Sequence, residues 1–177
     1  MKTILSAFLS LLLLVSCKKE VTELPPATQT GANTFGAKVN GAFWVPQGFA
    51  SIPDEDVLDA MMIGNDIIIN AQNFSSSPTE TEFVIRINGV TGPGTYLLNA
   101  NVTHPSNAAS YAYYVKRKFT PLNEWQTSST STGSVTITRI DTVNWIVSGT
   151  FAFNMLNLYN TPEPLAVTEG RFDVKIQ

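Results

Sequence analysis

Three features of the sequence carry side chains that could take part in chemistry: one histidine, one acidic cluster and one cysteine. The histidine is His104, which precedes Pro105 in a loop-like stretch. A lone histidine cannot form a histidine-rich metal site, and the sequence identifies no partners for it in a Ser-His-Asp triad. We therefore expect His104 to be an exposed structural residue of a loop.

The acidic cluster consists of Asp54, Glu55, Asp56 and Asp59. Carboxylates this close could bind Ca²⁺, but such a site needs about six to eight oxygen ligands, and the spaced ligands and central glycine of an EF-hand loop are missing. We expect a solvated loop or the start of a helix over residues 51–56, because a proline and carboxylates suit a first helical turn. The sequence predicts no metal site and no cofactor.

The common catalytic motifs are missing from the sequence: it has no GxSxG, HExxH, CxxC or Gly-rich phosphate loop. A two-carboxylate, carbohydrate-active enzyme remains an alternative, because a sequence does not show how far apart carboxylates lie in space. With 11 Lys and Arg against 14 Asp and Glu, and a net charge of −3, the chain lacks the basic surface that nucleic acid requires. We expect no catalytic residue and no nucleic-acid partner.

The cysteine, Cys17, follows a segment with the properties of an export signal. Lys2 supplies a positive charge, and residues 4–15 form an apolar run. As a helix, this run of about 12 residues would span about 18 Å, which is too short for a hydrocarbon core about 30 Å thick. Its end, Leu14-Val15-Ser16-Cys17, resembles the lipobox of bacterial lipoproteins.

This resemblance implies cleavage between Ser16 and Cys17 and attachment of lipid to Cys17. The thiol would carry a diacylglyceryl thioether and the new amine a further acyl chain, such as palmitate, and two or three chains anchor a protein stably. No Asp follows Cys17 as an inner-membrane retention signal, so we expect an anchor in the outer membrane. Lys19-Glu20 only partly resembles a surface-export signal, which leaves the periplasmic and cell-surface sides both open.

The chain is expected to have three parts. Residues 1–16 are a signal peptide, residues 17–33 are the lipidated cysteine and a flexible linker, and residues 34–177 are one β domain. The linker has no apolar periodicity and contains Pro25-Pro26. Fully extended, it would reach about 50 Å, so the domain could stand clear of the bilayer.

Residues 34–177 show the short apolar–polar alternations and frequent turn residues of an all-β protein. Turn sequences at Asn40-Gly41 and Gly64-Asn65-Asp66 predict two hairpins. About nine or ten antiparallel strands must protect their edges, so we expect an antiparallel β-sandwich. The alternative is a closed meander β-barrel similar to a lipocalin.

The alternation also predicts which side chains face the core. In the last strand, Phe172, Val174 and Ile176 would face inward, and the charges of Arg171, Asp173 and Lys175 would face water. An earlier strand would place Trp145 on the core face together with Val147, Gly149, Phe151 and Phe153.

Two aromatic residues are candidates for surface binding. Tyr114 alternates with Tyr111 and Tyr113 and is expected on the opposite, exposed face, beside cations. Trp125 lies between Glu124 and Gln126 and is a similar candidate. An exposed ring beside polar side chains can stack on a sugar or contact a protein, although each ring could equally be an ordinary surface residue.

Four stretches resemble an uncharacterised lipoprotein family of Bacteroidota. They are residues 34–41 (TFGAKVNG), 133–138 (GSVTIT), 148–153 (SGTFAF) and 169–174 (EGRFDV). Members of that family often have Cys where this chain has Ala37. The resemblance implies an envelope location and a β fold, and it carries no known activity.

Together, these features predict a non-catalytic, lipid-anchored lipoprotein of the cell envelope. Its membrane partner would be the bilayer that holds the acyl chains, and its β domain would bind a protein or a glycan. Two alternatives remain: a lipocalin-like carrier of an apolar small molecule, which requires an unfilled barrel interior, and a carbohydrate-active enzyme.

Overall fold

The computed structural model describes residues 20–48, 56–75, 79–117, 123–159 and 163–177. In these ranges the chain forms eleven β-strands and no helix. The strands are β1 (Thr34–Val39), β2 (Ala42–Trp44), β3 (Leu58–Ile63), β4 (Asp66–Asn73), β5 (Thr81–Ile87), β6 (Gly94–Leu97), β7 (Tyr111–Lys116), β8 (Glu124–Gln126), β9 (Gly133–Asp141), β10 (Ile146–Asn157) and β11 (Leu165–Lys175). Within the described ranges, we find no helix with the length and hydropathy needed to cross a membrane.

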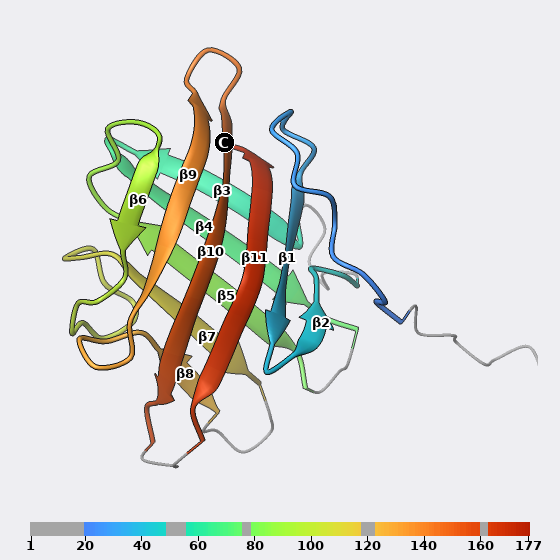
Figure 1. Cartoon of the computed structure of the whole chain (residues 1–177), viewed down its shortest axis with the longest axis vertical. Helices are drawn as coiled ribbons and strands as arrows, with labels where there is room; N and C mark the ends of the chain where they lie inside the picture. The colour runs from blue at the N-terminus through green and yellow to red at the C-terminus, as the bar shows by residue number, and fades with distance from the viewer. Residues whose placement is uncertain (1–19, 49–55, 76–78, 118–122, 160–162) are drawn as a thin grey trace, which may run out of the picture.

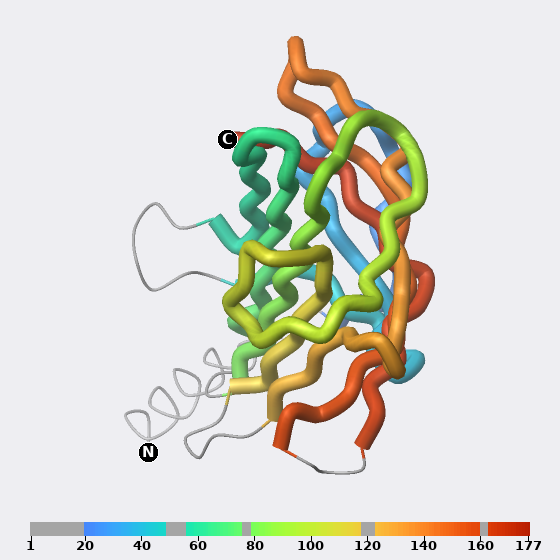
Figure 2. Tube along the Cα trace, turned by 90° about the vertical axis from the view of Figure 1, so that its left-hand side faces the viewer, coloured from blue at the N-terminus to red at the C-terminus, as the bar shows by residue number. Residues whose placement is uncertain are grey.

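The strands form one antiparallel sheet that curls into two facing layers (Figure 1). The first layer has the order β6-β9-β10-β11-β1-β2, and the second has the order β8-β7-β5-β4-β3. Strand β10 belongs to both layers, because its residues 146–153 pair with β9 and its residues 156–157 pair with β8. Figure 2 shows the two layers from the side. The predicted all-β antiparallel fold is confirmed, and the sheet is curled rather than closed, since its main path ends at β2 and β3.

Both hairpins expected from turn sequences are present. Asn40 and Gly41, with φ of 47° and 84°, connect β1 to β2. Gly64, with φ of 61°, lies in the turn between β3 and β4. Positive φ values are what tight hairpin turns require, and Gly and Asn adopt them most readily. Residues 51–55 of the expected helix lie outside the described residues, and the following Leu58–Ile63 is strand β3.

The core between the layers is filled by aromatic rings. The ring centroid of Phe35 lies 5.7 Å from that of Trp44, 5.8 Å from Phe83 and 5.1 Å from Phe151. The Tyr114 ring lies 4.6 Å from Phe83. These are ordinary packing distances between aromatic side chains. The lipocalin-like alternative requires an unfilled interior and so gains no support from this packing.

Trp145 is not on the core face, in contrast to the expectation. It lies at the hairpin between β9 and β10 with φ of 55°, and 55% of its surface is exposed. The carboxylate of Asp141 accepts hydrogen bonds from the backbone N–H groups of Val143 and Asn144 and so closes this turn. The turn therefore includes Trp145, and β10 begins one residue later, at Ile146.

Asp173 does not face water, which corrects a second expectation. Only 1% of its surface is exposed, because residues 28–32 cover this part of β11. Its carboxylate accepts hydrogen bonds of 2.7 to 3.2 Å from the hydroxyls of Thr28 and Ser148 and from the backbone N–H groups of residues 30–32. Burial alone would raise the pKa of Asp173, but these hydrogen bonds hold it well below its usual range.

Candidate functional site

A groove of about 1110 Å³ lies on the outer face of the second layer, on the side away from the aromatic core. Its floor is made by the outward side chains of β3, β4 and β5. Residues 104–107, from the segment between β6 and β7, form one wall. On the β3 side the groove is bordered by Asp56 and by Gln177, whose backbone N–H donates to Ala60 O at 2.9 Å. We call this site the β3–β5 groove.

The pairing of β3, β4 and β5 arranges the floor in rows that cross the strands. The rows are Met61–Ile68–Arg86, Asp59–Asn70–Val84 and Gln72–Glu82. Because side chains on one face of a sheet recur every second residue, each row is rigidly positioned by the backbone. The floor therefore presents amide, carboxylate and guanidinium groups beside apolar surface.

The charged groups of the floor are fixed by neighbours. Arg86 Nη2 lies 2.7 Å from Asp66 Oδ2, and Arg86 Nε donates to Asn88 Oδ1 at 2.9 Å. Glu82 pairs with Arg117. Asp59 Oδ2 accepts a hydrogen bond from Asn70 Nδ2 at 3.3 Å. Side chains that are already ordered lose little conformational entropy when a ligand binds, which favours recognition.

His104 anchors the wall of the groove to the sheet. Its ring stacks on Tyr113, with 3.9 Å between centroids, and its Nδ1 lies 2.9 Å from the Tyr111 hydroxyl. Its backbone N–H donates to Gln126 Oε1 at 3.0 Å, and the Gln126 amide donates to Val102 O. The single histidine thus has a structural role in a loop, as the sequence predicted, but it is partly buried rather than exposed.

The wall is uncharged at neutral pH. Burial lowers the pKa of His104, against the opposing effect of Glu82 and Glu124. Burial, followed by a hydrogen bond with Glu124, raises the pKa of Tyr113. Because an imidazole with a lowered pKa stays neutral at pH 7, the stacked pair contributes shape and hydrogen bonds to the groove rather than charge.

The groove brings together several residues that the sequence singled out. Asp56 and Asp59 of the acidic cluster line it together with His104, while Asp54 and Glu55 lie outside the described residues. In the part of the chain that the structure describes, no three His, Cys, Asp or Glu side chains gather closely enough to hold a metal ion. Ser16 and Cys17 also lie outside the described residues, so lipid attachment stays a prediction.

The two aromatic residues expected at the surface are in the core. Tyr114 and Trp125 are each only 6% exposed, and Trp125 Nε1 donates to Glu163 O at 2.9 Å. The expectation failed because β7 is covered on both faces: Tyr114 packs between the layers, and Tyr111 and Tyr113 pack under the His104 wall. Neither candidate ring can present its face to a partner.

Sequence reasoning missed the polar floor of the groove. Asn70 and Gln72 were not considered, although they alternate with Ile69 and Ala71 in β4 and so had to face away from the core. Arg86 alternates in the same way between Ile85 and Ile87. The alternation does place these side chains on the outward face, but amides on the outward face of a sheet are common and do not by themselves indicate a binding site.

Residues 32–174 match the family described as "Domain of unknown function (DUF6252)". The chain belongs to this family. The DUF6252 domain thus covers β1 to β10, all of β11 except Lys175, and the whole floor of the groove. No curated protein and no solved structure matches the chain.

Proposed function

We propose that this protein is a lipid-anchored, non-catalytic protein of the cell envelope whose DUF6252 domain binds an extended glycan in the β3–β5 groove. The observation that carries the proposal is the floor itself: planar amide, carboxylate and guanidinium groups stand in rows beside apolar side chains on a rigid sheet. Such groups offer paired donors and acceptors to hydroxyls, and Met61, Ile68 and Val84 offer apolar contact.

The envelope location is supported by the sequence alone. The apolar run before Cys17 is too short to span a bilayer, and the residues at its end resemble a lipobox. Replacement of Cys17 by Ser is expected to abolish acylation, which mass spectrometry and membrane fractionation would detect. An acylated mass in the Cys17→Ser protein would contradict the anchor.

The groove is tested with an array of polysaccharides and the mature chain. Asn70→Ala and Gln72→Ala should each weaken binding about tenfold, because a hydrogen bond to a ligand contributes about 1 to 1.5 kcal/mol and 1.4 kcal/mol is tenfold. The matched control is Thr150→Ala, on the outer face of the first layer, which should bind as the unchanged protein does. Equal binding by all three variants would place the ligand elsewhere.

Two other functions have distinct outcomes in the same experiment. If no polysaccharide binds but a photo-crosslinker at Gln72 captures one protein in cells, the partner is a protein. If the array shows saccharides being cleaved, and Asp59→Asn or Glu82→Gln stops the cleavage, the protein is a carbohydrate-active enzyme. Either outcome would replace the proposed glycan-binding function.

A further inference from the structure

The chain before β1 is bound to the domain along much of its length. The hydrogen bonds of residues 28–32 to the buried Asp173 fix one end of this segment. Arg139 Nη1 donates to Gln29 O at 2.5 Å, and Arg171 Nη1 donates to Pro25 O at 3.4 Å. Residues 20–26 border a second groove of about 520 Å³ together with residues 33–35 and 45–47. We call residues 20–32 the strap.

Gly36 shows how closely the strap approaches the sheet. An ideal Cβ at this position would lie 2.7 Å from Pro25 Cδ and 3.3 Å from Leu24 Cδ2. A distance of 2.7 Å is too short for two carbon atoms in contact, which normally lie about 3.5 to 4.0 Å apart. The strap therefore lies against the backbone of β1, at a position where only glycine leaves room for it.

This packing changes the length of chain available to an anchor. Three residue steps separate Cys17 from Glu20, which is at most about 11 Å when fully extended. A free segment from residue 17 to residue 33 would instead reach about 50 Å. The difference decides whether the domain stays at the bilayer or stands away from it.

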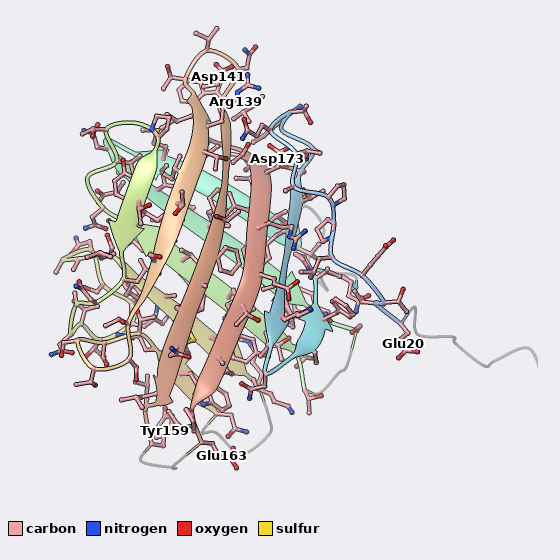
Figure 3. The ribbon with its side chains drawn as sticks, viewed as in Figure 1. Glu20, Arg139, Asp141, Tyr159, Glu163 and Asp173 are labelled. Carbon is pink, nitrogen blue, oxygen red and sulfur yellow. The ribbon has the colours of Figure 1, made fainter. Side chains whose placement is uncertain are left out.

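We propose that the strap holds the domain in one orientation against the bilayer, with the β1–β2 side toward the lipid surface and the β9–β10 hairpin away from it. This inference rests on the proposed lipid anchor at Cys17. In Figure 3, Glu20 lies beside the β1–β2 side of the molecule, whereas Arg139 and Asp141 lie at the β9–β10 hairpin. Along β10, the six residue steps from Ile146 to Ala152 separate the β9–β10 hairpin from the level of β2 by about 20 Å.

The anchor, and not an attraction between the strap and the lipid, holds the domain close to the bilayer. The exposed carboxylates Glu20 and Glu23 lie in the strap, and carboxylates are not attracted to anionic lipids. A protein without the anchor should therefore not bind vesicles of uncharged lipid, which also do not attract Lys18 and Lys19. The β3–β5 groove is on the second layer, whereas the strap makes its hydrogen bonds and its contact with Gly36 on the first layer. No residue of the strap lines the β3–β5 groove.

The orientation is measured with the acylated protein in vesicles that carry a short-range fluorescence quencher on their lipid headgroups. Acylation consumes the thiol of Cys17, so an introduced cysteine is the single free thiol for a fluorophore. We choose Phe43→Cys in β2 and Val143→Cys in the β9–β10 hairpin, which are both exposed. We expect at least a threefold larger fraction quenched at position 43 than at position 143.

Two further variants test the strap itself. A ten-residue Gly-Ser insertion between Lys19 and Glu20 lengthens the tether without touching the fold and should make quenching at the two positions equal. Gly36→Val should have the same effect, since its side chain displaces Pro25 while a β-branched residue suits strand β1. Equal quenching in the protein without these changes, or unchanged quenching after the insertion, would overturn the proposed orientation.

Different results would contradict the proposed anchor and the proposed orientation. If mass spectrometry finds no acyl chain and the protein does not associate with vesicles, the proposed anchor is wrong. If the protein is acylated and associates but both labels are quenched equally, the anchor stands and the orientation is wrong. If the Cys17→Ser protein binds vesicles of uncharged lipid by itself, the surface of the domain has lipid affinity and the role of the strap is wrong.

Discussion

Replacement of Asp173 by Asn should destabilise the domain strongly at neutral pH. Asp173 Oδ2 accepts from Thr28 and from backbone N–H groups of the strap, and Oδ1 accepts from Gly31 N at 2.8 Å and Ser148 Oγ at 2.7 Å. An Asn side chain supplies one oxygen and one NH₂ group. If its oxygen takes the place of Oδ2, its NH₂ group takes the place of Oδ1 and faces the Gly31 N–H, so that two donors meet. Hydrogen bonds to a buried charge contribute about 1.5 to 3 kcal/mol each, so we expect a loss of about 3 kcal/mol in the free energy of unfolding.

The stability that Asp173 contributes should depend on pH, and the direction of this dependence follows from its pKa. The pKa of Asp173 is below its usual range in the folded protein, so as the pH falls the unfolded chain takes up a proton at about pH 4 before the folded one does. The stability contributed by the carboxylate is therefore present at neutral pH and is lost as the pH falls below about 5. Asn has no proton to take up, so the difference between the two proteins should shrink toward pH 3.

Urea unfolding at pH 7 and pH 3.5, followed by tryptophan fluorescence, measures both effects. The matched control is Glu169→Gln, an exposed carboxylate on the same strand that pairs with Lys38 and should change stability by less than about 0.5 kcal/mol. A loss below about 1 kcal/mol for Asp173→Asn, or one of equal size at both pH values, would refute the argument that strap and sheet are joined by a buried charge.

Three further predictions concern the sheet and its covering loop. The pKa of His104 is lowered in the folded state, so its protonation opposes folding as the pH falls through about 6.5. Hydrogen exchange should therefore show residues 98–110 less protected at pH 5 than at pH 7.5. Protection in β9 should not change and serves as the internal reference. Gly170→Ala should lower stability by about 1 to 3 kcal/mol in thermal unfolding, since a Cβ there would lie 2.3 Å from the Phe151 ring, whereas Gly92→Ala, where nothing lies within 4 Å, should not. Burial raises the pKa of Tyr114 to about 12, so an absorbance titration should find it un-ionised at pH 11, and its ionisation near pH 10 would contradict its place in the core.

The fold was predictable wherever one side of a strand faces water. In β11, Phe172 and Val174 alternate with polar residues, and both are buried as expected. The Asn40-Gly41 turn also gave the correct connection between β1 and β2, because few residues tolerate positive φ. Local sequence was sufficient in these places because the constraint is itself local.

Prediction failed where distant segments cover a face. The alternation in β7 separates Tyr114 from Tyr113 correctly, but it cannot show that a loop covers one face and the facing layer covers the other. Asp173 is buried by residues about 140 positions earlier, and no pattern within β11 reports that contact. The polar rows of the β3–β5 groove likewise require the register of three strands, which a single sequence does not contain.

Strand β10 has a consequence for how the domain comes apart. Its first eight residues pair with β9 and its last two pair with β8, so one continuous strand is hydrogen-bonded to both layers of the sheet. If either layer separated, β10 would lose hydrogen-bonding partners, and the other layer depends on the same strand. Loss of structure should therefore occur in a single all-or-none step, and a half-open form with one layer intact should not accumulate.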